Sequence, residues 1–122
     1  MSHSAVREKS FEFALQMVEV YKVLRENREF VLSRQLLRSG TSIGANIEEA
    51  NAGQSRRDFL SKMSVALKEA RETRYWLSLL QRSRLVDIDL KSQLTGVEEL
   101  IRLLSAIVKT TKGTSRAAPT AR

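Results

Sequence analysis

Basic side chains are concentrated between Gln54 and Arg84, where they could contact phosphate groups. This stretch holds eight Lys or Arg residues against three acidic ones, and the 122-residue chain has a net charge of +7. The planar guanidinium of Arg can donate to two phosphate oxygens at once, and a positive surplus favours a polyanionic partner. The predicted contacts to RNA or DNA are Arg56, Arg57, Lys62, Arg71, Arg74, Arg82 and Arg84.

The same charges have a plainer interpretation as a solvated helix face. Opposite charges four residues apart often pair along exposed helices, and Lys68 and Glu72 have that spacing. Tyr75 and Trp76 could stack on bases, but their leucine-rich surroundings favour packing in a core or an interface.

A line of polar residues recurs four and three residues apart on one predicted helix. It contains Gln35, Ser39, Ser42, Asn46 and Glu49. An exposed helix edge and an internal hydrogen-bond network that fixes helix register are the main interpretations. A ligand site or an oligomer axis stays open as a third. The predicted structural network is Gln35, Arg38, Ser42, Asn46, Glu49 and Glu69, with Glu49 expected to pair with an arginine.

Carboxylates on several helices raise the question of a two-metal site. Such a site in a helical bundle needs two Glu-x-x-His motifs, whereas His3 is the only histidine and there is no cysteine. No nucleophile lies beside a base, and no glycine-rich loop could hold phosphate. The sequence therefore predicts no enzyme activity, no metal and no cofactor.

Apolar periodicity predicts four helices in one domain. Three are expected at Ser10 to Glu26, about Glu29 to Ala52, and Arg56 to about Gln81, and the fourth is expected to be capped by Asp87. Gly53 is expected to end the second helix in the left-handed conformation, and Ser55 with Asp58 to open the third.

The short connections predict an all-α, up-and-down antiparallel four-helix bundle with a left-handed twist. The expected division is an N-terminal extension at residues 1–9, the bundle at 10–112 and a disordered basic tail at 113–122. Because no apolar signal core or membrane span is recognisable, we expect a cytoplasmic protein.

The first predicted helix has apolar residues on two faces. Phe11, Leu15, Val18 and Tyr21 form one face, and Phe13, Met17, Val20 and Leu24 form the other. A lone bundle buries one face only, so a second exposed face would mark an interface. We assign Phe13, Met17, Val20 and Leu24 to the interface of a homo-oligomer, with a different protein partner as the alternative.

Residues 34–80 resemble a family of bacterial four-helix-bundle proteins encoded in intervening sequences of large-subunit ribosomal RNA genes. The resemblance includes Gln35-Leu36 with Arg38-Ser39, then Ser42-Ile43 with Asn46-Ile47 and Glu49, then Phe59-Leu60 and Ala66-Leu67-Lys68-Glu69-Ala70. It departs at Gly44, where proline is common, and at Ala50, where glycine is common.

The resemblance implies a basic homopentamer that binds nucleic acid, as in the related accessory variability determinant of diversity-generating retroelements. The leading prediction is a non-enzymatic homo-oligomer, with a ring of five favoured, that binds RNA or DNA through phosphate contacts. The alternative is a protein-interaction scaffold that docks a partner through an apolar helix face without nucleic acid.

Overall fold

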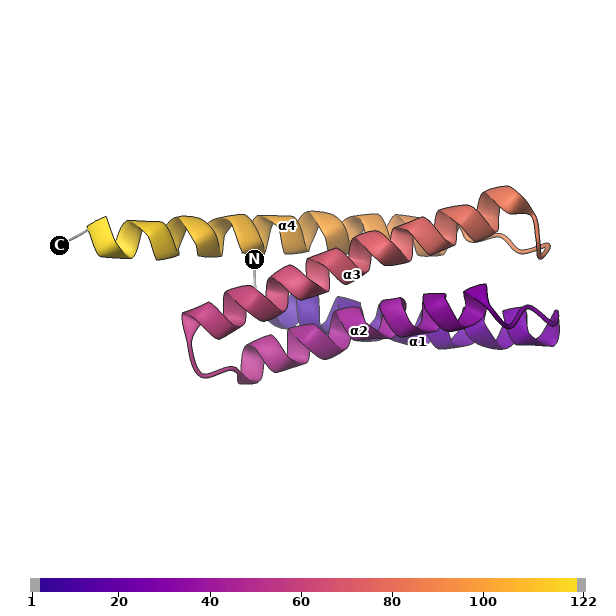
Figure 1. Cartoon of the computed structure of the whole chain (residues 1–122), viewed down its shortest axis with the longest axis horizontal. Helices are drawn as coiled ribbons and strands as arrows, with labels where there is room; N and C mark the ends of the chain where they lie inside the picture. The colour runs from indigo at the N-terminus through magenta and orange to yellow at the C-terminus, as the bar shows by residue number, and fades with distance from the viewer. Residues whose placement is uncertain (1–2, 121–122) are drawn as a thin grey trace.

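The computed structural model describes residues 3–120, and their side chains as far as residue 113. It has four helices, α1 (His3–Glu26), α2 (Leu32–Ala52), α3 (Arg56–Ser83) and α4 (Lys91–Thr120). Successive helices run in opposite directions, and α1 also packs against α4 (Figure 1). The prediction of an all-α, up-and-down four-helix bundle is confirmed.

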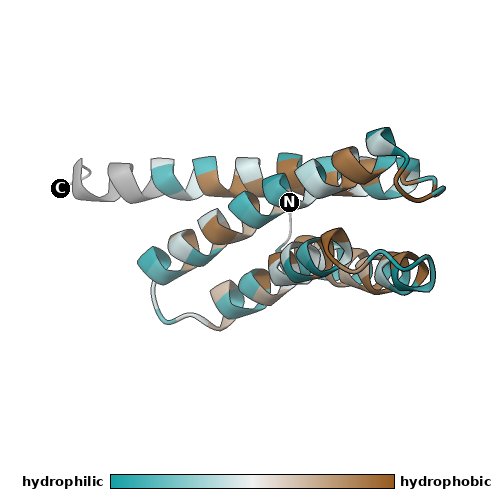
Figure 2. Cartoon of the chain, turned by 45° about the vertical axis from the view of Figure 1, so that its right-hand side comes forward, coloured by the Kyte–Doolittle hydropathy of each residue, from teal (hydrophilic) through white to brown (hydrophobic). Residues whose placement is uncertain are grey.

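The bundle encloses one core of aliphatic side chains together with Phe13, Met17 and Met63. Apolar and polar residues alternate along each ribbon, as amphipathic helices require (Figure 2). Burying one large apolar side chain stabilises the fold by about 1.5–3 kcal/mol. None of the described helices combines the length and the apolar composition needed to cross a membrane.

Helix α1 begins seven residues before its predicted start. Val6 is fully buried, and Val6, Ser10, Phe13 and Met17 continue one line at intervals of four, three and four residues. Ser10 tolerates this buried position because its hydroxyl donates to the carbonyl oxygen of Arg7 at 3.0 Å. A serine at a core position hid the periodicity, so the predicted extension at 1–9 is wrong from residue 3 onward, and Met1 and Ser2 lie outside the described residues.

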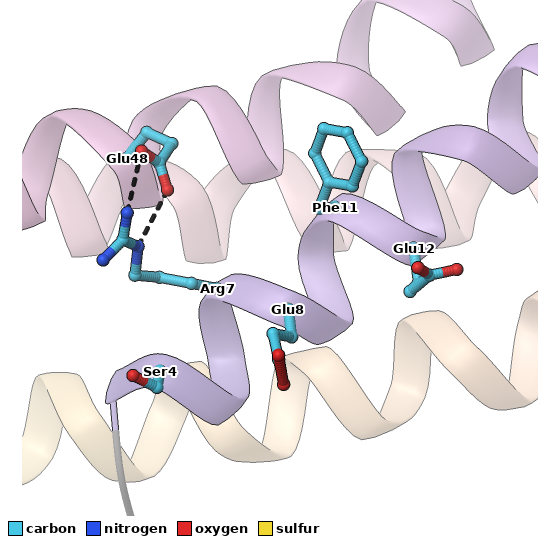
Figure 3. Close-up of a pocket in the computed structure, with 6 residues that line it drawn as sticks. All are labelled: Ser4, Arg7, Glu8, Phe11, Glu12 and Glu48. Carbon is cyan, nitrogen blue, oxygen red and sulfur yellow. Dashed lines mark hydrogen bonds and ion pairs between the residues drawn. The ribbon is translucent and has the colours of Figure 1, made fainter.

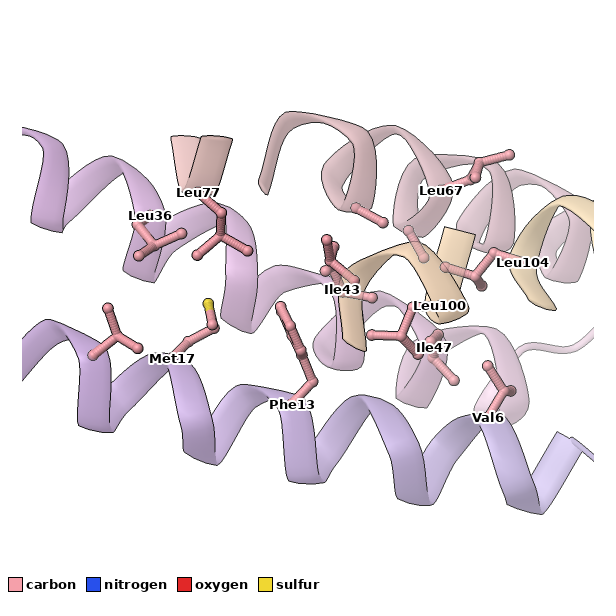
Figure 4. Packing of buried hydrophobic residues seen from close by; sticks show 14 of the residues in the cluster. Val6, Phe13, Met17, Leu36, Ile43, Ile47, Leu67, Leu77, Leu100 and Leu104 are labelled. Carbon is pink, nitrogen blue, oxygen red and sulfur yellow. The ribbon is translucent and has the colours of Figure 1, made fainter. Parts of the chain in front are cut away.

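The predicted interface face of α1 is the one that faces the core. Exposure of Phe13, Met17, Val20 and Leu24 is at most 4%, and Figure 4 shows the first two pointing from α1 toward the other helices. The interface assignment of these four residues is therefore wrong. The opposite face is the exposed one, with Phe11 65% exposed.

Two glycines explain why α1 turns that face inward. A Cβ on Gly40 of α2 would overlap Met17, at 2.9 Å from its Sδ and 3.2 Å from its Cβ. A Cβ on Gly96 of α4 would lie 3.4 Å from Cδ1 of Phe13. These glycines let the large side chains of α1 fit between α2 and α4.

Helix α2 begins with a carboxylate cap rather than at the predicted Glu29. The Glu29 carboxylate accepts hydrogen bonds from the backbone N–H groups of Val31, Leu32 and Ser33, at 3.1, 3.0 and 2.6 Å. These groups have no partner within the helix, so the carboxylate satisfies them and also complements the helix dipole.

The other helix ends confirm one predicted cap and correct two. Ser55 accepts from the N–H of Asp58 at 3.0 Å, as predicted for the start of α3. Gly53 has φ −66° and ψ 158°, so its predicted left-handed conformation is wrong. Asp89, not Asp87, accepts from the first N–H of α4, that of Lys91, at 3.0 Å.

Helix α4 continues past the predicted boundary at residue 113 and extends beyond the ends of its neighbours (Figure 1). The side chains of residues 114–122 lie outside the described part of the chain. The disorder expected for this tail therefore stays a prediction.

Gly40→Ala tests the close approach of α1 and α2. Alanine favours helix over glycine by about 1 kcal/mol, but overpacking against Met17 costs about 1–3 kcal/mol. We expect the free energy of unfolding to fall by up to about 2 kcal/mol in urea denaturation. Gly44→Ala is the matched control, because its Cβ would lie 3.4 Å from the Ser10 carbonyl oxygen, and it should be neutral or stabilising. Equal stabilisation by both substitutions would contradict this explanation.

Candidate functional site

A polar seam joins α2 to α3. The Arg38 guanidinium lies 3.3 Å from Oε1 of Glu69 and also pairs with Glu72, whose Oε2 accepts the indole N–H of Trp76 at 2.9 Å. The Glu69 side chain is only 15% exposed. The seam therefore contains Arg38 and Glu69 of the predicted network and adds two residues of α3.

Beneath the seam, the predicted polar line reaches the core at one point. Ser39 and Thr73 are fully buried, and their hydroxyl groups are hydrogen-bonded at 2.9 Å. Farther along α2, Ser42 donates to the carbonyl oxygen of Ser39, and Asn46 to that of Ser42. These last two side chains donate to backbone carbonyl groups of their own helix, whereas Ser39 bonds to a side chain of α3.

The ends of the predicted network lie apart from the seam. Glu49 pairs with Lys62 of α3 at 2.6 Å rather than with an arginine, and Gln35 is exposed. Lys62 belongs to the predicted phosphate-binding set, so one of those cations already has a carboxylate partner.

The remaining basic residues of α3 include a continuous line on its outer side. We define the basic line as eight residues at alternating intervals of four and three, none of which is buried: Arg57, Ser61, Ser64, Lys68, Arg71, Tyr75, Ser78 and Arg82. It contains no acidic residue and extends about 38 Å along the helix. Within the described residues, none of its four cations is in an ion pair.

The basic line unites three predicted contacts and adds one. Lys68 was expected to pair with Glu72, but that carboxylate is occupied by Arg38 and Trp76. Arg56 and Arg74 are five helical turns apart and lie on one side of α3, which is not the side of the basic line. Arg84 lies at the C-cap of α3, with φ 55°. The seven predicted residues therefore do not form one surface.

A second candidate surface is an apolar groove between α1 and α2. It passes between Phe11 and Ala14 of α1 and the small residues Thr41, Gly44 and Ala45 of α2. Leu15 and Val18, 48% and 39% exposed, continue the apolar face of Phe11 along α1. We call the exposed apolar surface of Phe11, Leu15 and Val18, together with the groove beside it, the α1 outer face.

A bidentate ion pair closes one end of the groove. Arg7 donates through Nε to Oε1 of Glu48 at 2.8 Å and through Nη2 to Oε2 at 3.1 Å, one turn from Phe11 (Figure 3). The hydrogen bond from Arg7 lowers the pKa of the Glu48 carboxyl below its ordinary value. Both side chains are exposed, so salt screens this pair.

Two of the described carboxylates, those of Glu69 and Glu72, meet at Arg38. Over residues 3–120 of the chain, with side chains considered where they are described, no three His, Asp or Glu side chains are grouped closely enough to hold a metal ion.

The fold and its surfaces define a small, basic, all-α bundle protein. The family model for 23S rRNA-intervening sequence proteins matches residues 2–106, and the chain belongs to this family. A crystal structure of a protein of unknown function from the S23 ribosomal protein family of Bacteroides thetaiotaomicron is 49% identical, with a TM-score of 0.84. The match covers 89% of this chain and 99% of that one. No curated protein matches the sequence.

The Arg7–Glu48 pair predicts a dependence on pH. Because the folded-state pKa of Glu48 is lowered, its stabilising contribution is present above the unfolded-state pKa and is lost as pH falls through the folded-state pKa. Carboxyl NMR should give a Glu48 midpoint that rises in Arg7→Met and in high salt. The same midpoint in wild type and variant would contradict the assigned cause.

Proposed function

We propose that this chain is a non-enzymatic, nucleic-acid-binding protein that contacts phosphate groups through the basic line of α3. The observation that carries the proposal is the arrangement of charge around that helix. Two of the three acidic residues between Gln54 and Arg84 are Glu69 and Glu72, and both are engaged by Arg38 at the seam with α2. Because the basic line contains no carboxylate, the outer side of α3 presents positive charge along its length.

The shape and chemistry of the basic line suit a nucleic-acid backbone. Arg57, Lys68, Arg71 and Arg82 follow one continuous helix, and serine hydroxyls between them can donate to phosphate oxygens. Contacts of this kind position a strand without reading its sequence, so we propose binding with little base preference.

We further propose that the α1 outer face associates with a second copy of the chain. Phe11, Leu15 and Val18 expose apolar surface on consecutive turns, and small residues of α2 beside them allow another helix to approach closely. An assembly of identical chains would cover this surface on each protomer. The resemblance described above implies a ring of five.

Reversing charge on the basic line tests nucleic-acid binding. In fluorescence anisotropy with a structured RNA, four phosphate contacts predict a loss of affinity of about 50- to 150-fold between about 50 and 200 mM salt. Lys68→Glu with Arg71→Glu should weaken binding at least about tenfold and reduce the salt slope by about 1.4–1.8. Lys22→Glu with Arg34→Glu is the matched control, because it changes net charge equally on exposed sites of α1 and α2.

Two results would overturn the proposal. One is the absence of a complex at low salt, and the other is an affinity that both double variants lower equally, because non-specific attraction to net charge would then account for binding.

Light scattering tests self-association. Wild-type protein should have the mass of an oligomer, and Leu15→Glu should give a folded monomer because it places charge in the middle of the α1 outer face. Leu85→Glu is the control, since Leu85 is 61% exposed in the loop before α4 and lies outside that face. A monomeric wild-type protein would rule out self-association and leave the face to a different protein.

A further inference from the structure

Tyr75 interrupts the series of cations and serines on the basic line. Its side chain is 60% exposed, with Arg71 one turn before it and Arg82 two turns after it. Proteins that bind single-stranded nucleic acid commonly have an exposed aromatic ring between cations. The cations contact the phosphates, and an unpaired base stacks on the ring.

The ring of Tyr75 is held from one side by Trp76. The two ring centroids lie 5.2 Å apart at 74°, an edge-to-face contact that leaves at least one face of the phenol ring uncovered. Trp76 is itself fixed, because its indole N–H donates to Glu72, which pairs with Arg38 of α2. The polar seam thus holds Trp76 against one side of the Tyr75 ring and does not cover the exposed side.

A surface hollow lies beside the ring. Its lining consists of Tyr75, Ser78, Leu79, Arg82 and Ser83. The Ser83 hydroxyl is already hydrogen-bonded to the backbone of Leu80 and Leu85. Leu79 gives an apolar wall for a base, the Ser78 hydroxyl can bond to sugar or base atoms, and Arg82 can reach a phosphate. These are the chemical groups that one nucleotide requires.

From this arrangement we propose that Tyr75 is the base-stacking residue of a nucleotide subsite, which binds unpaired bases of single-stranded RNA or DNA. The subsite rests on the proposed nucleic-acid function and specifies its substrate class. Bases inside a duplex are already stacked on one another and cannot stack on an exposed ring as well, so single strands bind more tightly than duplexes of equal length. Because every base has a stacking face, the preference for sequence is small.

The full-length protein contains an intrinsic fluorescence probe for this subsite. Trp76 is the only tryptophan and lies against Tyr75, so its fluorescence should change when a base stacks there. The probes are an oligouridylate of about 12 nucleotides, a strand of the same length with abasic sites, and a duplex of equal length.

Tyr75→Ala should weaken binding of the oligouridylate by about 5- to 150-fold, the range that stacking of one base is worth. It should leave the affinity for the abasic strand and the salt slope unchanged. Tyr75→Phe keeps the ring and should bind within about twofold of wild type. Circular dichroism melting confirms that each variant is folded.

The outcomes separate this inference from the proposed function. If Tyr75→Ala binds the oligouridylate as wild type does while Lys68→Glu with Arg71→Glu loses binding, the stacking subsite is overturned and phosphate binding stands. Tighter binding of the duplex, or an equal loss on the abasic strand, also overturns the subsite. If no probe binds at low salt, the proposed function fails, and the exposed ring belongs to a protein contact instead.

Discussion

The contact of Arg38 with Glu69 and Glu72 decides what α3 presents to solvent. Partly exposed ion pairs stabilise a fold only modestly, so the main consequence of this contact is positional. It turns two carboxylates toward α2, and one of them also receives the indole N–H of Trp76. The outer line of α3 is left with cations, serines and Tyr75, and both proposals about nucleic acid depend on that separation of charge.

The polar line of α2 contains side chains with different structural roles. Ser39 lies in the core because Thr73 provides a hydroxyl partner across the interface at 2.9 Å. Ser42 and Asn46, at neighbouring positions of the same line, bond to backbone carbonyl groups of α2 and need no partner helix. Regular spacing predicted one shared role for these side chains, whereas burial gives each of them a different one.

Helix α1 shows why the interface was assigned to the wrong face. Its two apolar faces are similar in composition, so periodicity alone could not say which one the bundle buries. The choice depends on the space opposite each face, which Gly40 of α2 and Gly96 of α4 leave for Met17 and Phe13. That information lies in residues far away in the sequence, and only packing brings them together.

The sequence by itself determined the four helices, their antiparallel order and the Ser55 cap, because local periodicity and short connections control them. The motifs of residues 34–80 identified the family. The sequence also identified the basic stretch and three of the four cations of the basic line. Tertiary structure alone decided which face of α1 is buried, that Glu72 turns to Arg38 and not to Lys68, and that Tyr75 is exposed while Trp76 is held. The physical reason is that a side chain's partner across an interface is set by distance in space, which spacing along one helix cannot supply.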